Sequence, residues 1–295
     1  MNHQPSDVDQ LSDLEIGELL DKAEPLGKII TNPGPNDLFF GTSVYKLTTN
    51  TIVKIAQYPE DGLDSREVNA LNFVFAKTTI PVPRVRRVVR ESDGCFWIVM
   101  DHVPGTTLAQ IWPTLSIWRK IWIAFTLRRY IRQLRRVRVS ATTPPGPLSK
   151  EGPRRCESPV FGLHRPRGPF TSYSALSNFF NERHNASANI DKLPHDDPSR
   201  NESFDDSEPL VLTHQDLNLR NLILGNDGRI WMIDWGWSGL FPPWFEYVSM
   251  ERQNEVERIS GTNDPMWKAF IPFICGPYFR QKMWLKNVAS GLYYG

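Results

Sequence analysis

A short polar loop followed by two apolar runs constrains the fold of this 295-residue chain more than any other feature. The segment Leu212–Gly236 reads LTHQDLNLRNLILGNDGRIWMIDWG, and its apolar runs Leu222–Leu224 and Ile230–Ile233 flank the sequence GNDG. Asn, Asp and Gly favour tight turns between paired strands. The pattern predicts a hairpin that brings the loop before its first strand close to Asp234 after its second.

Three polar side chains of this segment have oxygen atoms suited to metal and proton chemistry. Asp216 and Asn221 lie five residues apart in the loop, and Asp234 follows the second strand. Carboxylate and amide oxygens are the hard ligands that Mg²⁺ prefers, and Mg²⁺ commonly keeps waters and binds phosphate oxygens. Asn221 and Asp234 are therefore candidate Mg²⁺ ligands, and Asp216 is a candidate acceptor for a hydroxyl proton. Such a set is typical of phosphoryl transfer.

Composition excludes several other classes of protein. The chain has 34 Lys plus Arg against 33 Asp plus Glu, a formal charge of +1, and 40% hydrophobic residues. A near-zero charge gives no field broad enough to define a nucleic-acid or membrane partner by itself. The three cysteines include no CxxC pair, which argues against a disulfide framework and a four-ligand zinc site and favours a reducing compartment.

Neither end of the chain shows a targeting or membrane signal. The first residues lack the basic-then-apolar pattern of a secretory signal. The apolar stretch Ala269–Phe279 is interrupted by Pro272 and Pro277 and is much shorter than the roughly 20 residues needed to cross a bilayer. We therefore expect a cytoplasmic protein without a membrane span.

The first hundred residues predict a small sheet with two helices. Apolar residues at helical spacing predict a helix over Asp13–Leu20 and a second helix that Ser65 and Glu67 open. β-branched and aromatic runs predict strands at Val44–Thr48, Ile52–Ala56, Val85–Val89 and Cys95–Met100.

The pattern changes after a loop at Asp101–Gly105. A helical pattern extends from Leu108 to Val139, and the end of the chain is again helical and aromatic. Between them, residues 140–209 hold ten prolines mixed with Ser, Asp and Arg, which predicts a long insertion or mobile loop.

The chain resembles the aminoglycoside phosphotransferase and choline kinase-like family of the protein kinase-like superfamily. The resemblance rests on four motifs: His214-Gln215-Asp216 followed by Asn221, Ile233-Asp234-Trp235, Lys54 in TIVKI, and Glu67 in REVNAL. One of these alone is a weak signal, but four in the family's order on the expected elements are specific.

The resemblance implies an α+β, two-lobed protein kinase-like fold. Residues 1–100 would form an N-terminal nucleotide-covering lobe with a small antiparallel sheet, and residues 101–105 a hinge. Residues 106–295 would form a mostly helical catalytic and acceptor-binding lobe, with the Pro-rich insertion at about 140–209.

It also implies an ATP- and Mg²⁺-dependent transfer of the γ-phosphoryl group to a hydroxyl of a small molecule. Asp216 would orient and deprotonate that hydroxyl, Asn221 and Asp234 would hold Mg²⁺, and Lys54, held by Glu67, would bind the α- and β-phosphates. Further candidates are Gly41 and Ser43 for the phosphates, Ile52, Met100 and His102 for the adenine, and Arg220 for transition-state charge.

The sequence departs from the family's pattern at several points. Gln215 stands where Gly is common, Trp235 rather than Phe follows Asp234, and the phosphate loop FFGTSV has a single glycine. No segment matches the activation loop and A-P-E motif of protein kinases, which argues against a protein substrate. A catalytically silent nucleotide-binding module that acts through partners is the alternative function.

Several candidate residues have a structural interpretation as well. Lys54 is alternatively an edge-strand residue that discourages pairing, Glu67 a carboxylate at a helix start, and Arg220 a surface residue. His214 is interpreted as structural, and Asp227 as a turn residue.

The acceptor site is the least defined part of the chain. The aromatic side chains after Asp234 either stack on a substrate or, as we prefer, belong to the core: Trp237, Trp244, Phe245 and Tyr247. Glu246 among them pairs with a substrate amine or braces a loop arginine.

The segment Arg119–Arg138 has eight Lys or Arg residues, no acid and interleaved apolar residues. Such a helix is either a core helix with a solvated basic face, which we prefer, or a binder of membrane or nucleic acid. We therefore expect no nucleic-acid partner.

Overall fold

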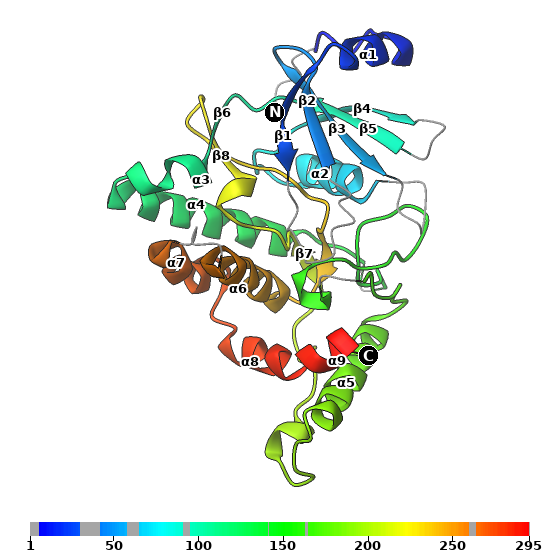
Figure 1. Cartoon of the computed structure of the whole chain (residues 1–295), viewed down its shortest axis with the longest axis vertical. Helices are drawn as coiled ribbons and strands as arrows, with labels where there is room; N and C mark the ends of the chain where they lie inside the picture. The colour runs from blue at the N-terminus through cyan, green and yellow to red at the C-terminus, as the bar shows by residue number, and fades with distance from the viewer. Residues whose placement is uncertain are drawn as a thin grey trace.

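The computed structural model of the chain describes residues 6–29, 42–57, 65–90, 95–140, 142–162, 165–259 and 264–294. An antiparallel five-stranded sheet from the first part of the chain lies above a largely helical region (Figure 1). The strand order is β1-β2-β3-β5-β4, with β1 at Glu24–Ile29, β2 at Thr42–Lys46, β3 at Thr51–Gln57, β4 at Val85–Arg90 and β5 at Cys95–Asp101. The sequence predicted all of these strands except β1.

Side-chain alternation along β3 determines which residues face the helical region. Val53 packs with Ile16 in a small core beside α1 (Asp13–Leu20). Lys54, one residue on, lies opposite Ile98 of β5, which belongs to the main core. Lys54 therefore points to the opposite face from Val53, toward the main core. Because β3 lies between β2 and β5, the interpretation of Lys54 as an edge-strand residue is wrong.

Both predicted helices of the sheet region are present. In α1, the side chain of Ser12 and that of Glu15 form a reciprocal capping box. α2 (Arg66–Lys77) begins after Ser65, whose Oγ accepts a hydrogen bond from the N–H of Val68 at 3.3 Å. The buried face of α2 includes Glu67, so this carboxylate lies beneath the sheet rather than in solvent.

The helical region follows β5. Its elements in chain order are β6 (Gly105–Thr107), α3 (Leu108–Ile111), α4 (Ile117–Arg136), α5 (Tyr173–Ile190), β7 (Val211–Thr213), β8 (Leu222–Gly225), β9 (Ile230–Met232), β10 (Gly239–Phe241), α6 (Trp244–Ile259), α7 (Pro265–Cys275), α8 (Phe279–Asn287) and α9 (Ala289–Tyr294). The predicted helical run from Leu108 to Val139 is broken by a 3-10 turn at Trp112–Thr114. Among the described helices, none has the length and apolar character to cross a bilayer.

The arginine-rich segment forms α4, and its core role is confirmed. One face of α4 is buried in the main core through Ile123, Leu127, Ile131 and Leu134. These positions follow the 3.6-residue period of an amphipathic helix, so burial of this face stabilises the helical region.

The predicted hairpin is present as β8 and β9. Leu222 lies opposite Met232, and the turn between the strands contains Gly228 with a φ of 77°, a conformation that glycine adopts without strain. Just outside the ladder, the N–H of Ile233 donates to the carbonyl of Asn221 at 3.0 Å. This bond places Asn221 beside the residue that precedes Asp234.

The prediction of a mobile loop across residues 140–209 is wrong in one important respect. Residues 173–190 form α5, an 18-residue helix capped by Ser172, whose Oγ accepts from the N–H of Ala175. The segment lies between Pro169 and Pro194 and contains no proline, and its buried residues Leu176, Phe180 and His184 recur every four positions. The composition of the longer stretch concealed this local helical pattern.

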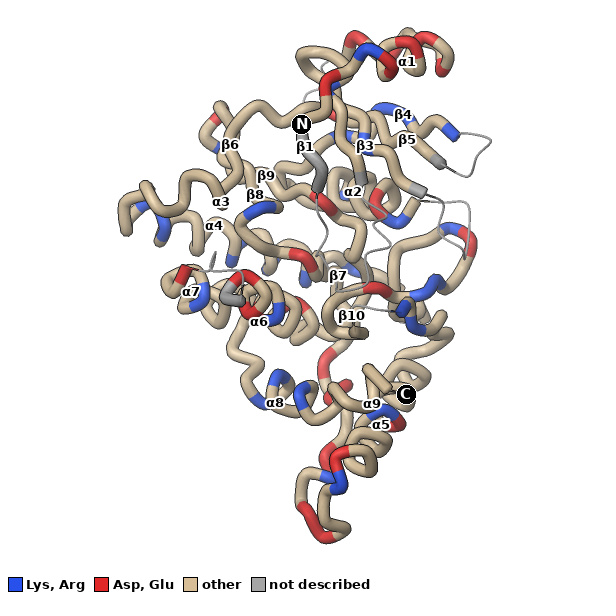
Figure 2. The backbone as a smooth tube through the Cα atoms, in the orientation of Figure 1, with Lys and Arg blue, Asp and Glu red and all other residues tan. Residues whose placement is uncertain are grey.

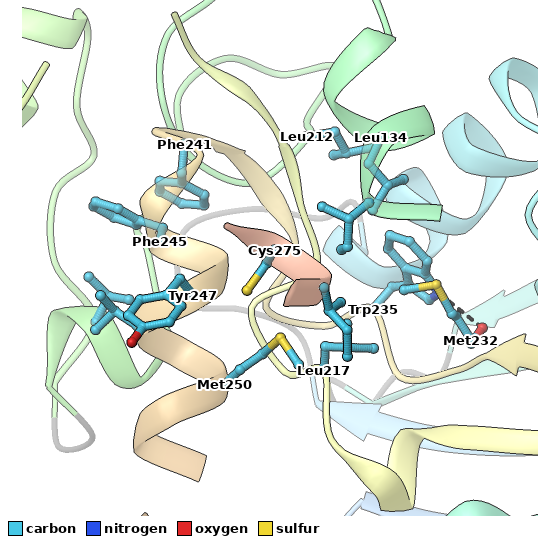
Figure 3. Packing of buried hydrophobic residues seen from close by; sticks show 14 of the residues in the cluster. Leu134, Leu212, Leu217, Met232, Trp235, Phe241, Phe245, Tyr247, Met250 and Cys275 are labelled. Atoms are coloured by element: carbon cyan, nitrogen blue, oxygen red, sulfur yellow. Dashed lines mark hydrogen bonds between the residues drawn. The ribbon is translucent and has the colours of Figure 1, made fainter. Parts of the chain in front are cut away.

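The main core holds the polar loop from both sides. Leu212 and Leu217, before and within the loop, and Trp235, after Asp234, are at most 1% exposed. Figure 3 shows these residues together with Phe245 and Met250 of α6. A loop anchored in a close-packed core has little freedom to move, so its polar side chains are held in place.

Candidate active site

Glu246 in the first turn of α6 fixes the start of the loop after β7. Its two carboxylate oxygens accept the backbone N–H groups of His214 at 2.6 Å and Gln215 at 3.2 Å. The side chain is 1% exposed, and burial raises its pKa to about 7 although the two backbone bonds oppose this. Glu246 therefore holds the loop backbone, and its pairing with a substrate amine or a loop arginine stays a prediction.

His214 connects the loop to the hairpin. Its Nδ1 accepts from the N–H of Asp216 at 3.2 Å, which leaves the proton on Nε2, and Nε2 donates to the carbonyl of Ile233 at 3.1 Å. Burial lowers its pKa to about 4, so the ring is neutral near pH 7. Both ring nitrogens are used in holding Asp216 against the segment before Asp234, as expected of a structural histidine.

Gln215 occupies a left-handed backbone conformation, with a φ of 61°. This conformation is the reason why glycine is suited to the position. In this chain, the Gln215 side chain is buried, and its Oε1 accepts a hydrogen bond from Ser158 Oγ at 2.6 Å. Gln215 therefore ties the loop to the Pro-rich segment, a contact that glycine has no side chain to make.

The carboxylate of Asp216 is surrounded by amide donors. Oδ2 accepts from Asn221 Nδ2 at 2.8 Å, and Oδ1 accepts from Asn218 Nδ2 at 3.0 Å and Gln253 Nε2 at 2.8 Å. Burial and the charge of Asp234 raise the pKa of Asp216 to about 8, against the effect of these donors. A cation near both carboxylates would lower it again.

Lys54 joins the sheet to the hairpin through two buried ion pairs. Its Nζ lies 2.7 Å from Glu67 Oε2 on α2 and 2.7 Å from Asp234 Oδ1 after β9. Burial alone would lower the pKa of Lys54, but the charges of Asp234 and Glu67 raise it above its ordinary value. Asp234 in turn has a lowered pKa, because the charge of Lys54 and its hydrogen bond outweigh burial. We call Lys54, Glu67 and Asp234 the buried ionic cluster.

The residues predicted to bind Mg²⁺ fit that ion. The Nδ2 group of Asn221 donates to the backbone carbonyl of Asp216 at 2.9 Å as well as to its carboxylate, so the Asn221 amide oxygen faces away from those bonds. No described residue donates a hydrogen bond to that oxygen. The backbone of Asn221 is bonded to that of Ile233, and Asp234 is the next residue in the chain. The described residues contain no group of three or more His, Cys, Asp or Glu side chains suited to a metal. One amide and one carboxylate suffice for Mg²⁺, which takes its other ligands from water and phosphate.

The residues predicted for the nucleotide are spread along the sheet. Ile52 lies opposite Met100, Ser43 lies in β2 opposite Ile55, and Gly41 is outside the described residues. The N–H of His102 donates to the carbonyl of Asn50 at 2.8 Å. That N–H is therefore engaged within the sheet region and not directed at a ligand.

Arg220 lies at the edge of the site. Its side chain is 50% exposed and its Nη1 lies 2.5 Å from Glu257 Oε1 on α6. The charge of Arg220 opposes the rise of the Asp216 pKa, which indicates that the guanidinium acts on the carboxylate electrostatically. The half-exposed side chain agrees with a surface residue, and the role of Arg220 toward a transferred phosphoryl group stays a prediction.

Sequence reasoning missed Gln253. It belongs to one face of α6, with Glu246 seven residues before it and Glu257 four residues after it, and all three side chains contact the loop or its flanking residue. Gln253 is 3% exposed, and its Oε1 is buried without a hydrogen-bond partner among the described residues. Polar residues at helical spacing after Pro243 were the signal that would have revealed it.

The aromatic residues proposed for an acceptor are mostly core. Trp244, Phe245 and Tyr247 are at most 1% exposed, and Trp244 Nε1 donates to the carbonyl of Asp205 at 2.9 Å. Their preferred structural interpretation is confirmed. Only Trp237 of the set is partly exposed.

The five-stranded antiparallel sheet, the helical region and the ionic cluster between them define a protein of the kinase-like class. The model of the family described as "Phosphotransferase enzyme family" matches residues 40–259, and the chain belongs to this family.

A solved structure of low sequence identity has the same fold. A thermostable mutant of aminoglycoside phosphotransferase APH(4)-Ia in its apo form superposes with a TM-score of 0.52 at 15% sequence identity, covering 94% of this chain and 98% of that one. A thermostable mutant of the same enzyme in a ternary complex with AMP-PNP and hygromycin B gives a TM-score of 0.46 at 15% identity and covers 96% of this chain and 99% of that one. ADP-bound APH(2'')-Ib gives 0.46 at 16% identity, covering 95% and 97%. No curated protein sequence matches the chain.

Proposed function

We propose that the protein transfers the γ-phosphoryl group of ATP, with Mg²⁺, to a hydroxyl group of a small molecule. The observation that supports this most is that hydrogen bonds of Asn221 and His214 hold the loop against Ile233, the residue before Asp234 of the buried ionic cluster. A phosphate-binding cation, two oxygen ligands and a carboxylate base are the groups that phosphoryl transfer requires, because the protein mainly positions reactants and neutralises charge.

Each residue of the cluster has a proposed role. Lys54 binds the α- and β-phosphates, and Glu67 keeps its ammonium in place when Asp234 engages the metal. Asn221 and Asp234 hold Mg²⁺, which when bound neutralises phosphate charge. Asp216 orients the acceptor hydroxyl and accepts its proton, while its amide donors fix the direction of its carboxylate.

The remaining nucleotide contacts are proposed from position. Ile52 covers the adenine, Ser43 and Gly41 approach the phosphates, and the backbone between Met100 and His102 faces the adenine edge with groups other than the engaged N–H of His102. Arg220 stabilises charge on the transferred phosphoryl group after its pairing with Glu257 loosens. Residues 101–105 are the proposed hinge between the lobes.

A small-molecule acceptor in the cytoplasm is the proposed substrate. Several similar structures contain aminoglycosides, such as streptomycin and gentamicin bound to APH(2'')-IIa. In this chain the buried aromatic residues of α6 offer no surface for stacking, so the acceptor is defined here only by its hydroxyl group.

The test separates nucleotide binding from transfer. We expect Asp216→Asn to abolish ATP-dependent transfer in a metabolite screen while retaining a thermal shift with Mg-ATP. We expect Asp234→Asn to lose the Mg²⁺-dependent part of that shift. Asp227→Asn, in the hairpin turn, is the matched control because it removes the same charge away from the site.

Two outcomes would contradict the proposal. Full turnover in both Asp216→Asn and Asp234→Asn would refute the residue roles. A Mg-ATP shift in the wild type without transfer to any acceptor would instead support the silent nucleotide-binding module.

A further inference from the structure

One face of α4 is not used by the core and presents a continuous stripe of exposed side chains. Trp118 is 77% exposed, Trp122 39% and Phe125 59%, and the next residues at the same helical spacing are the exposed Arg129, Arg132 and Arg136. The spacings of four, three, four, three and four residues place all six on one line along the helix. We call these six residues the α4 stripe.

The inward arginines of α4 serve the fold and are not part of the stripe. Arg128 donates to the carbonyl of Phe273, and Arg135 donates to the carbonyls of Cys275 at 2.5 Å and Pro243 at 3.1 Å. Arg129, Arg132 and Arg136 form no ion pair in the described part of the chain. Because Arg128 and Arg135 bond to backbone carbonyls of the fold, a binding surface on α4 would consist of its outward residues.

The surroundings of the stripe add apolar and basic groups. Arg119 stacks over the ring of Trp122 at 4.3 Å, and Phe125 contacts Phe273 of α7 with ring centroids 4.8 Å apart. α4 has no acidic residue and is drawn without red in Figure 2. The sequence of α7 beside it, PMWKAFIPFIC, contains no acidic residue either. Asp264, before α7, lies 4.0 Å from Lys120, so its charge is directed at the buried side of α4.

We propose that the α4 stripe docks on the surface of an anionic phospholipid membrane. The aromatic half enters the interfacial layer, where indole and phenyl rings are favoured, and the three arginines contact lipid phosphate and carboxylate groups. The charge of the partner follows from the stripe: a face with three guanidinium groups outside any ion pair of the described chain, and with no acid, attracts a negative surface. The inference is independent of the proposed catalytic function.

The arrangement of the stripe favours a membrane over a nucleic acid. In sites for single-stranded nucleic acid, aromatic and basic side chains are interleaved so that bases stack while phosphates are neutralised. In the α4 stripe they are separated into an aromatic half and an arginine half. Separation suits a lipid interface, which is itself divided into an apolar and a charged layer.

Vesicle co-sedimentation of the full chain tests the proposal. We compare phosphatidylcholine vesicles with vesicles containing about 30% phosphatidylserine, between about 0.05 and 0.5 M NaCl. We expect binding to the anionic vesicles that weakens with salt, and a loss on the order of a hundredfold in the triple variant R129Q/R132Q/R136Q. The variant W118S/W122S/F125S should weaken binding at every salt concentration, and W118S alone should weaken it less.

Matched controls remove the same groups elsewhere on the surface. R90Q/R165Q/K286Q lowers the net charge equally, and L14S/M283S/Y294S removes three exposed apolar side chains. Both should bind anionic vesicles like the wild type. Unchanged circular dichroism and thermal midpoints show that all variants fold.

The proposal is overturned if wild type fails to bind anionic vesicles at low salt, or if the stripe variants bind as tightly as it does. Two other results would also overturn it, each in the absence of vesicle binding by the wild type. In the first, the wild type binds a single-stranded RNA oligonucleotide and the stripe variants do not. In the second, the wild type forms a concentration-dependent dimer in analytical ultracentrifugation and the stripe variants do not.

Discussion

The geometry of Asp216 depends on a residue outside the recognised motifs. Gln253 supplies one of the amide donors to its Oδ1, and it does so from α6 rather than from the loop itself. A carboxylate that accepts bonds from a loop and from a helix is fixed against both, so its direction is set by tertiary packing.

We predict that Gln253→Leu lowers the turnover of the proposed phosphotransferase reaction by about tenfold to a hundredfold while leaving the KM for ATP unchanged. The side chains are similar in size, and the change also removes a buried oxygen that has no partner among the described residues, so the free energy of unfolding should change little. Steady-state kinetics and urea unfolding measure the two effects.

Glu255→Gln is the control for this prediction, since its side chain is 42% exposed on α6 and its carboxylate pairs with Lys282 instead of with the loop. A Gln253→Leu enzyme with wild-type turnover would show that the loop alone positions Asp216.

Single residues also show what the sequence does and does not reveal. The candidate metal ligands and Lys54 were found from motif spacing, because these residues lie on predictable strands and loops. The left-handed backbone conformations of Gln215 and Asp234 could not be found from motif spacing. They depend on how Glu246 and His214 hold the loop in the folded chain.

Among the elements, α6 has the largest influence on the site, because three side chains on one of its faces contact the loop: Glu246, Gln253 and Glu257. Its first turn holds two backbone N–H groups through Glu246, whose pKa is raised to about 7 by burial. The pKa of this carboxyl group is about 7 in the folded state and 4.5 in the unfolded state. Its contribution to stability is therefore fully present at a pH below 4.5 and is lost as the pH rises through about 7.

We predict that raising the pH increases the unfolding free energy of Glu246→Gln relative to that of the wild type. As the pH rises from about 4.5 to about 7, the variant should gain about 3 kcal/mol relative to the wild type, because it has no carboxyl group to ionise. Groups common to both proteins, including His214, cancel in this difference. Urea unfolding across this pH range measures it, and a constant difference would contradict the raised pKa.

Helix packing elsewhere in the fold supports a second prediction at this scale. A Cβ on Gly291 of α9 would lie 2.0 Å from the backbone oxygen of Arg183 on α5, whereas a Cβ on Gly17 of α1 would meet the Trp97 ring at an ordinary 3.5 Å. We expect Gly291→Ala to destabilise the protein by about 1–3 kcal/mol through overpacking. Gly17→Ala should stabilise it by about 0.5–1 kcal/mol through helix propensity.

The pair serves as its own control, because the same methyl group is added to a helix in both cases. If Gly291→Ala raised the thermal midpoint as Gly17→Ala is expected to do, α5 and α9 would not be in the close contact that the structure shows.

The sequence predicted those helices and strands in which apolar residues recur with one regular spacing. α1, α2 and the β8–β9 hairpin were predicted because their apolar spacing and turn residues are local signals. β6 and β10 were not, because strands of three residues are defined by their partners, as β10 is by β7. β1 was missed because its sequence EPLGKI contains a proline and a glycine, which are uncommon inside strands. α5 was hidden by surrounding prolines.

For the whole molecule, the buried ionic cluster is the connection that matters most. Lys54 comes from the sheet, Glu67 from the helix beneath it and Asp234 from the hairpin of the helical region. The family's motif order predicted that these residues meet. It did not predict that Asp234 pairs directly with the ammonium group proposed to bind phosphate.

This arrangement gives Lys54 two separable roles. In Lys54→Met, two buried carboxylates lose their shared cation, so the free energy of unfolding should fall by about 3–5 kcal/mol. We expect Mg-ATP to stabilise the wild type by about 2.7 kcal/mol at a concentration about a hundred times its Kd, and this stabilisation should be absent in the variant. Urea unfolding with and without Mg-ATP measures both quantities.

The double variant Lys54→Met with Glu67→Gln distinguishes the two roles. Removing one of the unpaired charges should restore part of the unfolding free energy, because fewer buried ions lack a partner, yet the response to Mg-ATP should remain absent. If the double variant recovered the nucleotide response along with its stability, the role of Lys54 would be to hold the lobes together, and the phosphates would have to be bound by other groups of the chain.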